Sequence, residues 1–197
     1  GLLYAGTNRG VHVSFDDGES WQSLQLNLPT TGINDLLAHG DDLIVATQGR
    51  AIWALDVVEP LRQLAIAEAS GGVERHRPTL LQPAPAVRLR ANQNRDTPLP
   101  PEESRGENPP TGAVIDYLLP VGARGPIVLE VFDGAGARVR RFASDELPDR
   151  PRAGVYFADR WLAAPDLPAT TAGHHRFVWD LRRERPRALD YDYSIAA

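Results

Sequence analysis

The stretch from Ser14 to Trp21, Ser-Phe-Asp-Asp-Gly-Glu-Ser-Trp, constrains the fold of this chain more than any other feature. The carboxylate of Asp16 can accept backbone N–H groups of the turn that follows, and Ser14 can add a further bond. Gly18 permits a left-handed backbone conformation that a Cβ would penalise. Trp21 begins the next strand, and we expect its ring to enter an apolar core. The segment therefore predicts a tight turn between two strands.

Short strand patterns surround this turn at regular spacing. Apolar or alternating runs bounded by turn residues predict strands at residues 2–7, 11–15, 21–28, 33–38, 43–47 and 51–57. Residues 3–11 also align with residues 44–52, and such a repeat is typical of propeller blades built from four strands. We therefore predict that the first part of the chain is all-β.

The rest of the chain predicts one short helix and then further strands. Pro60 suits a first helical turn, and Gly71 and Gly72 can end the helix. Strands are predicted at residues 86–90, 113–119, 127–132, 138–142 and 176–181, with a further short strand at 155–157. Residues 92–112 form a proline-rich loop. Alternation places Phe177 and Trp179 on one face, where they can fill a sandwich core.

The turn motif carries a resemblance to a known family. The residues Ser14, Asp16, Gly18 and Trp21 match Ser-x-Asp-x-Gly-x-x-Trp, which resembles the Asp box, or BNR repeat, of sialidases and related propellers. Residues 46–56 resemble the final blade of bacterial Asp-box proteins similar to sortilin-type propellers, although Gln48 stands where these often carry His, and Ala51 where they carry Gly. The resemblance implies that the Asp box lies on the outer rim. Asp16 is then a structural turn residue, and a catalytic acid is the alternative.

The second part of the chain resembles the FlgD-like immunoglobulin-type domain that follows such propellers. The residues that carry this resemblance are 115–119, 128–133, 136–142 and 173–181. We therefore predict an all-β chain made of the last blades of a β-propeller and an Ig-like β-sandwich. The expected boundaries are 1–59 for the blades, 60–79 for helix and linker, 80–185 for the sandwich and 186–197 for a tail. This family closes the domain with a further strand, so we expect either a truncated sandwich or one closed by residues 191–195.

Arg50 is a candidate ligand contact. An arginine at the mouth of a propeller can bind a carboxylate through two hydrogen bonds. The alternative is a surface arginine that pairs with Asp56 or Asp35.

Two further clusters are candidate metal sites. His174 and His175 are neighbours on a predicted strand and face opposite ways, so they are poorly placed to bind one ion. Asp190 and Asp192 could form a weak calcium site, and a solvated tail is the alternative. We expect neither a metal site nor a cofactor.

Composition excludes several classes of partner. The chain has 197 residues and a net charge of -5, and we expect no nucleic-acid partner. Cys is absent, which excludes disulfides and thiolate metal sites. No apolar run approaches the roughly 20 residues that a membrane helix needs. No signal peptide is visible, and we expect a processed or excised fragment of a secreted or periplasmic parent.

These observations lead to one expected function and two alternatives. We expect the C-terminal scaffold or binding fragment of a glycosyl-hydrolase-like BNR-repeat propeller protein, without catalytic activity of its own. Its expected partners are the missing blades or a second copy, and a glycan or protein ligand. The alternatives are a sialidase-like glycoside hydrolase acting on extracellular glycans, and a protein–protein interaction or assembly module.

Overall fold

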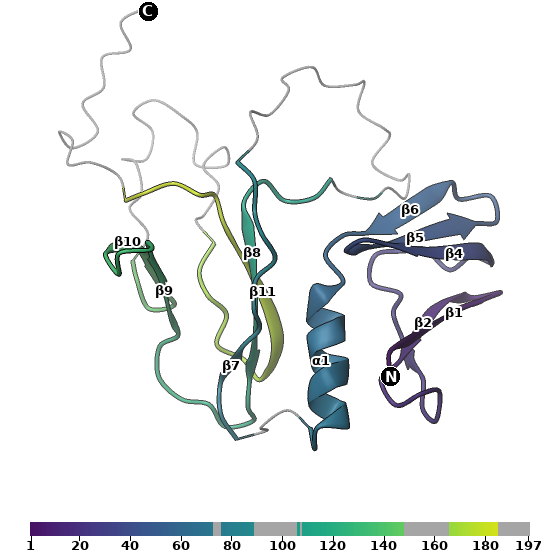
Figure 1. The fold of residues 1–197 in the computed structure, drawn as a ribbon, viewed down its shortest axis with the longest axis horizontal. Coiled ribbons are helices and arrows are strands. Elements are labelled where there is room, and N and C mark those ends of the chain that lie inside the picture. Colours follow the sequence, from purple (N-terminus) through teal and green to yellow (C-terminus); the bar gives the residue numbers. More distant parts are fainter. Residues whose placement is uncertain (73–75, 89–105, 107, 148–165, 185–197) are drawn as a thin grey trace, which may run out of the picture.

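The computed structural model describes residues 1–72, 76–88, 106, 108–147 and 166–184. The described chain is mostly β, with several small antiparallel sheets, none of them closed, and one short helix between two β parts (Figure 1). Within this part of the chain, no helix has the length and apolar character needed to cross a membrane.

The N-terminal β part consists of two three-stranded antiparallel sheets. The first has the order β1-β2-β3 and the second β4-β5-β6. Their bounds are Leu3–Thr7 for β1, Gly10–Ser14 for β2, Gln22–Ser23 for β3, Ile33–His39 for β4, Asp42–Thr47 for β5 and Ile52–Leu55 for β6.

The two N-terminal sheets pack against each other around one apolar cluster. Its buried residues come from β2, β5 and the loops that follow the sheets: Val11, Leu28, Leu43, Val45 and Val58. Gly6 of β1 lies so close to β4 that a Cβ built on it would be 2.6 Å from Cγ2 of Ile33. A glycine at this position therefore allows the two sheets to approach.

The strand predicted at residues 21–28 is wrong in extent, because only Gln22–Ser23 pairs with β2. The chain then turns away from the sheet. Leu26 has a positive φ of 45°, and the N–H of Leu28 donates to the carbonyl of Gln25 at 2.8 Å. The side chain of Gln25 donates to the carbonyl of Leu28 at 2.7 Å, which holds this turn and ends the strand.

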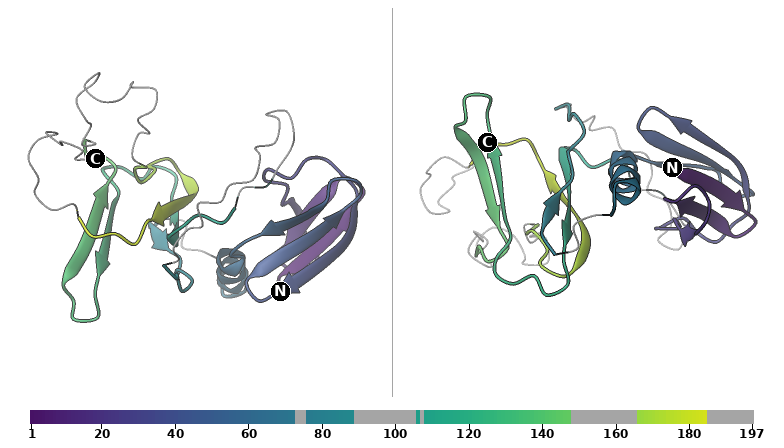
Figure 2. Two further views of the ribbon diagram at one scale, coloured as in Figure 1. Left: turned by 90° about the horizontal axis from the view of Figure 1, so that it is seen from above. Right: turned by 60° about the horizontal axis from the view of Figure 1, so that its bottom comes forward.

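The helix α1, Glu59–Ala69, lies between the two β parts, as the views in Figure 2 show. Pro60 is in its first turn, where the missing N–H costs no hydrogen bond, and is buried. The helix ends at two glycines, Gly71 and Gly72, both with positive φ. The N–H of Gly72 donates to the carbonyl of Ala67 at 2.8 Å, which satisfies one of the free carbonyls at the helix end.

The C-terminal β part consists of a three-stranded and a two-stranded sheet. The orders are β11-β8-β7 and β10-β9, all antiparallel. The bounds are Thr79–Leu80 for β7, Ala113–Leu119 for β8, Val128–Phe132 for β9, Arg138–Ala143 for β10 and Gly173–Trp179 for β11.

The two C-terminal sheets face each other across a second core. Its buried residues are Ile115, Tyr117, Leu119 and Phe177. The rings of Phe142 on β10 and Phe177 on β11 lie 4.7 Å apart between centroids and join the two sheets. Trp179 packs against the same core, on the face shared with Phe177.

Two predicted strands of this part need correction. Residues 86–88 form no strand, and the sheet uses Thr79–Leu80 instead. The strand predicted at 176–181 begins earlier and ends at Trp179, because Leu181 has a positive φ of 59°. Residues 89–90, the short strand at 155–157, most of the loop 92–112 and the tail 186–197 lie outside the described residues.

Candidate functional site

The turn after β2 is organised by the side chains of Ser14 and Asp16. Ser14 is 1% exposed, and its hydroxyl donates to Oδ1 of Asp16 at 2.8 Å. The N–H of Gly18 donates to the Ser14 hydroxyl oxygen at 2.8 Å, and the N–H of Ser20 donates to Oδ1 of Asp16 at 2.9 Å. Ser20 also donates its hydroxyl to Oδ2 of Asp16. Both carboxylate oxygens therefore hold the turn.

These hydrogen bonds set the proton affinity of Asp16. Bonds from the hydroxyl and N–H of Ser20, and then from the hydroxyl of Ser14, lower the pKa of Asp16 to about 2. The carboxylate is therefore ionised at neutral pH, where it can accept protons but has none to donate. A general acid needs a pKa near the working pH. The geometry therefore disfavours the catalytic-acid alternative for this residue.

The expectation that Trp21 fills an apolar core is wrong. Its side chain is 43% exposed, and its ring lies over the turn. The indole Nε1 donates to the carbonyl of Gly18 at 3.1 Å. Gly18 has a positive φ of 96°, and the preceding Asp17 has a φ of 61°. Trp21 therefore stabilises the turn from outside.

The hairpin turns of the two repeats share one hydrogen-bond pattern. The hydroxyls of Thr7 and Thr47 donate to a carbonyl across the turn at 2.9 and 2.6 Å. The same hydroxyl oxygens accept the N–H of Arg9 at 3.2 Å and of Arg50 at 3.1 Å. The second turn holds one residue more between the threonine and its acceptor. For this reason the two threonines lie one position apart in the sequence alignment of the repeats.

Arg50 projects from the second of these turns and is exposed. Among the described residues no ion pair joins Arg50 to Asp35 or Asp56, so the arginine lies at the surface without the pairing that the alternative named. Asp35 accepts the N–H of Leu36 instead, at 2.9 Å. Burial, and then the charge of Asp42, raise the pKa of Asp56 above its ordinary range. Arg50 is therefore open to solvent.

A buried carboxylate on β8 forms a polar cluster with two residues of β11. Asp116 is 3% exposed, and its carboxylate contacts the side chains of two residues of β11. Arg176 donates from Nε to Oδ1 at 3.0 Å and from Nη2 to Oδ2 at 3.1 Å, which is a two-pronged contact. Nε2 of His174 lies 2.8 Å from Oδ1. The cluster joins β8 to β11 through side chains as well as through the backbone.

Two opposed effects act on Asp116. Burial raises the pKa of this carboxyl, but hydrogen bonds from His174 and Arg176 and attraction to their charges lower it by more. The net pKa lies below the ordinary value for an aspartate. Asp116 is therefore ionised at neutral pH, and Arg176 balances its charge.

His174 and Arg176 also line a pocket of about 290 Å³ where β11 meets α1 and the N-terminal sheets. Its other walls are apolar and include Leu55, Leu61 and Leu64. His175 lies on the opposite face of the strand, with Nε2 2.6 Å from the carbonyl of Thr171. The two histidines therefore cannot share a metal ion. Among the described residues, no group of three or more His, Cys, Asp or Glu could hold one.

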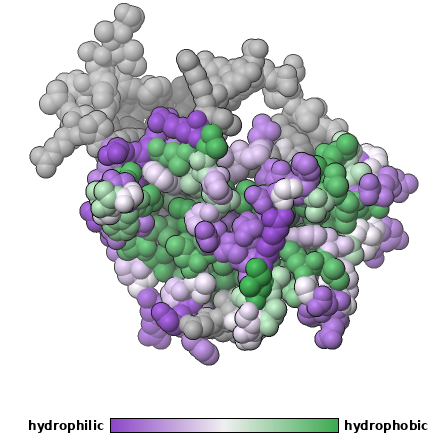
Figure 3. Space-filling model, viewed as in Figure 1, coloured by the Kyte–Doolittle hydropathy of each residue, from purple (hydrophilic) through white to green (hydrophobic). Residues whose placement is uncertain are grey.

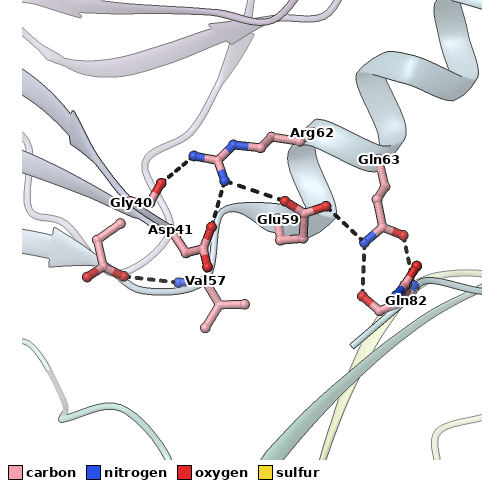
Figure 4. A network of polar contacts seen from close by, with 8 residues as sticks. Gly40, Asp41, Val57, Glu59, Arg62, Gln63 and Gln82 are labelled. Atoms are coloured by element: carbon pink, nitrogen blue, oxygen red, sulfur yellow. Dashed lines mark hydrogen bonds and ion pairs between the residues drawn. The ribbon is translucent and has the colours of Figure 1, made fainter. Parts of the chain in front are cut away.

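Helix α1 is tied by hydrogen bonds to both β parts (Figure 4). Arg62 donates to the carboxylate of Asp41 at 2.7 Å and to the carbonyl of Gly40, in the turn between β4 and β5. The next residue of the helix, Gln63, forms two hydrogen bonds with the backbone of Gln82, just after β7. It donates to the Gln82 carbonyl at 2.9 Å and accepts the Gln82 N–H at 2.8 Å.

Comparisons with protein-family models, with curated proteins and with solved structures find no match for this chain. The functional interpretation therefore depends on the geometry and on the turn motif.

Sequence analysis missed the Asp116 cluster, although the sequence carries a signal for it. Asp116 stands in the middle of the apolar strand Ala113–Leu119, where a charge must be paired if the strand is buried. Arg176 and His174 alternate on Gly173–Trp179, so they share one face. The pairing of β8 with β11, 60 residues apart in the chain, was not predictable from this pattern alone.

Proposed function

We propose that the chain is the C-terminal scaffold of a glycosyl-hydrolase-like Asp-box propeller protein and is not catalytic by itself. In this proposal residues 1–59 are the last blades of the propeller, and residues 80–185 are a FlgD-like Ig-type sandwich. The parent protein is secreted or periplasmic. The chain holds the end of the propeller against the sandwich and presents both to a glycan or protein ligand.

The observation that carries this proposal is the placement of α1. Arg62 bonds to the turn between β4 and β5, and Gln63 bonds to the backbone beside β7. A helix that is bonded to both β parts is a rigid connector, in contrast to a flexible linker of similar length. A fixed orientation of two β parts is what a scaffold has to provide.

The turn after β2 supports the structural role of Asp16. Among the described residues, the side-chain oxygens of Asp16 accept hydrogen bonds from Ser14 and Ser20, two and four positions away, and these bonds serve the turn. The low pKa of Asp16 suits such a role and does not suit proton donation.

The sheet edges of the N-terminal part support the proposed partners. Leu37 of β4 is 54% exposed, and Ile52 of β6 is 73% exposed. β4 and β6 are the two edge strands of their sheet among the described residues. Exposed apolar edge strands favour pairing with another chain or segment, and neighbouring blades or a second copy would cover them.

A turnover assay with a panel of fluorogenic glycosides tests the proposal. We expect the isolated chain to release no fluorophore above the enzyme-free rate. Hydrolysis that disappears in Asp16→Asn, and persists in the control Asp145→Asn, would show that the chain is itself a glycosidase. Asp145 is exposed and lies in the C-terminal part, away from the turn.

A further inference from the structure

The pocket of about 290 Å³ between α1 and β11 has the size and lining of a site for a small ligand. Its walls come from the loop after β3, the end of β6, the first half of α1 and the strand β11. Apart from His174 and Arg176, the described residues that line it are apolar. Ligand pockets in proteins are typically apolar spaces of this kind with a few polar groups, and this volume is near the lower end of their range.

Two walls of the pocket hold apolar residues in a left-handed backbone conformation. Leu26 has a φ of 45° and Val57 a φ of 59°, and both line the pocket. This conformation is uncommon outside glycine and is most unfavourable for a β-branched side chain such as that of Val57. Strained backbone positions gather at sites that hold ligands. Leu26 is also 71% exposed, so a bound ligand would cover an apolar side chain that now faces water.

Exposed apolar side chains alone do not distinguish this pocket, because Figure 3 shows such side chains at the surface of both β parts. The pocket differs in the polar wall that His174 and Arg176 form on β11. This wall determines which head group a ligand can carry.

The polar wall offers hydrogen-bond donors and an acceptor. Asp116 accepts bonds from Nε and Nη2 of Arg176, and the guanidinium has five N–H groups, so three of them do not bond to Asp116. Nε2 of His174 lies 2.8 Å from Oδ1 of the ionised Asp116 and therefore carries a hydrogen. In the neutral ring Nδ1 is then an acceptor. A hydroxyl group both accepts and donates, so it can use both residues.

The charges beside this wall are already balanced. The carboxylate of Asp116 pairs with Arg176. Burial and the charge of Asp42 raise the pKa of Asp56, and the charge of Arg176 opposes them, so this arginine also lies within the electrostatic reach of Asp56. An anionic head group would therefore meet two carboxyl groups, and a cationic one would meet Arg176. Either ion would also lose hydration between apolar walls, which an uncharged head group avoids.

We infer that this pocket binds a small uncharged alcohol with an apolar body. Its hydroxyl bonds to Arg176 and His174, and its hydrocarbon part lies against Leu26, Val57 and Leu64. The bound alcohol contacts α1 and both β parts at once. This inference does not rest on the proposed scaffold function, because it depends only on the lining of the pocket.

Titration of the full chain with octan-1-ol, followed by heteronuclear NMR, tests the inference. Amide signals of α1 and β11 should shift, and octan-1-ol should bind at least about tenfold more tightly than octanoate or octylammonium, which carry the same chain on charged heads. From hexan-1-ol to octan-1-ol the affinity should rise about fourfold for each added CH₂ group. No shift with octan-1-ol, or equal or tighter binding of either ion, would overturn the inference.

A pair of matched variants locates the site. Leu26→Asn removes an apolar wall, and because Asn tolerates a positive φ the turn should be kept. This variant should bind octan-1-ol about tenfold more weakly. Leu80→Asn is the control: Leu80 is similarly exposed, at 62%, but lines the separate apolar groove of about 630 Å³ in the C-terminal β part. It should retain the affinity. Weaker binding in Leu80→Asn alone, or unchanged binding in both variants, would show that the alcohol does not occupy the pocket beside α1.

Discussion

Asp16 organises its turn through neighbours that are all close in sequence, from Ser14 to Ser20. Such contacts follow from local turn chemistry, and the sequence is sufficient to predict them. The prediction that Trp21 is buried was wrong, because the bond from its Nε1 to the carbonyl of Gly18 holds the ring over the turn, where it is 43% exposed.

The low pKa of Asp16 predicts a contribution to acid stability. The folded protein holds the proton less tightly than the unfolded chain, so this contribution is complete above about pH 4 and is lost as the pH falls towards 2. Urea unfolding at a series of pH values should show a smaller loss of stability in Asp16→Asn than in the unsubstituted chain over this interval. Asp145→Asn, on an exposed residue, is the control, and an identical pH dependence in all three proteins would contradict the assigned hydrogen bonds.

Replacing the buried Asp116 should lower the free energy of unfolding more than replacing an exposed aspartate. Asp116→Asn keeps the shape but removes the charge that Arg176 and His174 face, and it should lower the free energy of unfolding by about 1–3 kcal/mol. Asp180→Asn is the matched control, because Asp180 also pairs with an arginine, at 3.6 Å, but is 60% exposed. It should change stability by less than about 0.5 kcal/mol. Equal effects in urea unfolding would show that the buried pair contributes no more than the exposed one.

At the scale of elements, sequence patterns located most strands because alternation and turn residues act locally. Ala113–Leu119 is observed with the bounds that its apolar run predicts. The patterns could not show which strands pair, since β8 and β11 are joined only in the folded chain. The patterns also could not show the short strand β7, because two residues are too few to display the alternation of apolar and polar side chains that marks a strand.

Strand β1 can approach β4 closely because residue 6 is a glycine and has no side chain. Gly6→Ala would place a Cβ 2.6 Å from Cγ2 and 2.9 Å from Cβ of Ile33, and a β-branched side chain has little freedom to move away. We expect a loss of about 1–3 kcal/mol in the free energy of unfolding. Gly134→Ala is the control, because a Cβ there meets nothing within 4 Å. Equal thermal stability of both variants would contradict the close packing of the two sheets.

At the scale of the whole molecule, α1 decides whether the chain is one scaffold or two β parts on a linker. Its hydrogen bonds to Asp41 and to Gln82 come from the successive residues Arg62 and Gln63, and each joins a different β part. Neither contact was predictable from the helical pattern of residues 60–69, because both partners are about 20 residues away in the chain. The two contacts together predict a fixed relative orientation.

Distance measurement by double electron–electron resonance tests this central claim most directly. The chain has no Cys, so Arg9→Cys and Ala135→Cys can carry spin labels in the β1–β2 and β9–β10 turns without background labelling. We predict one narrow distance distribution, which broadens when Arg62→Ala and Gln63→Ala are added. A broad distribution in the chain that retains Arg62 and Gln63 would contradict the claim that α1 holds the two β parts as one scaffold.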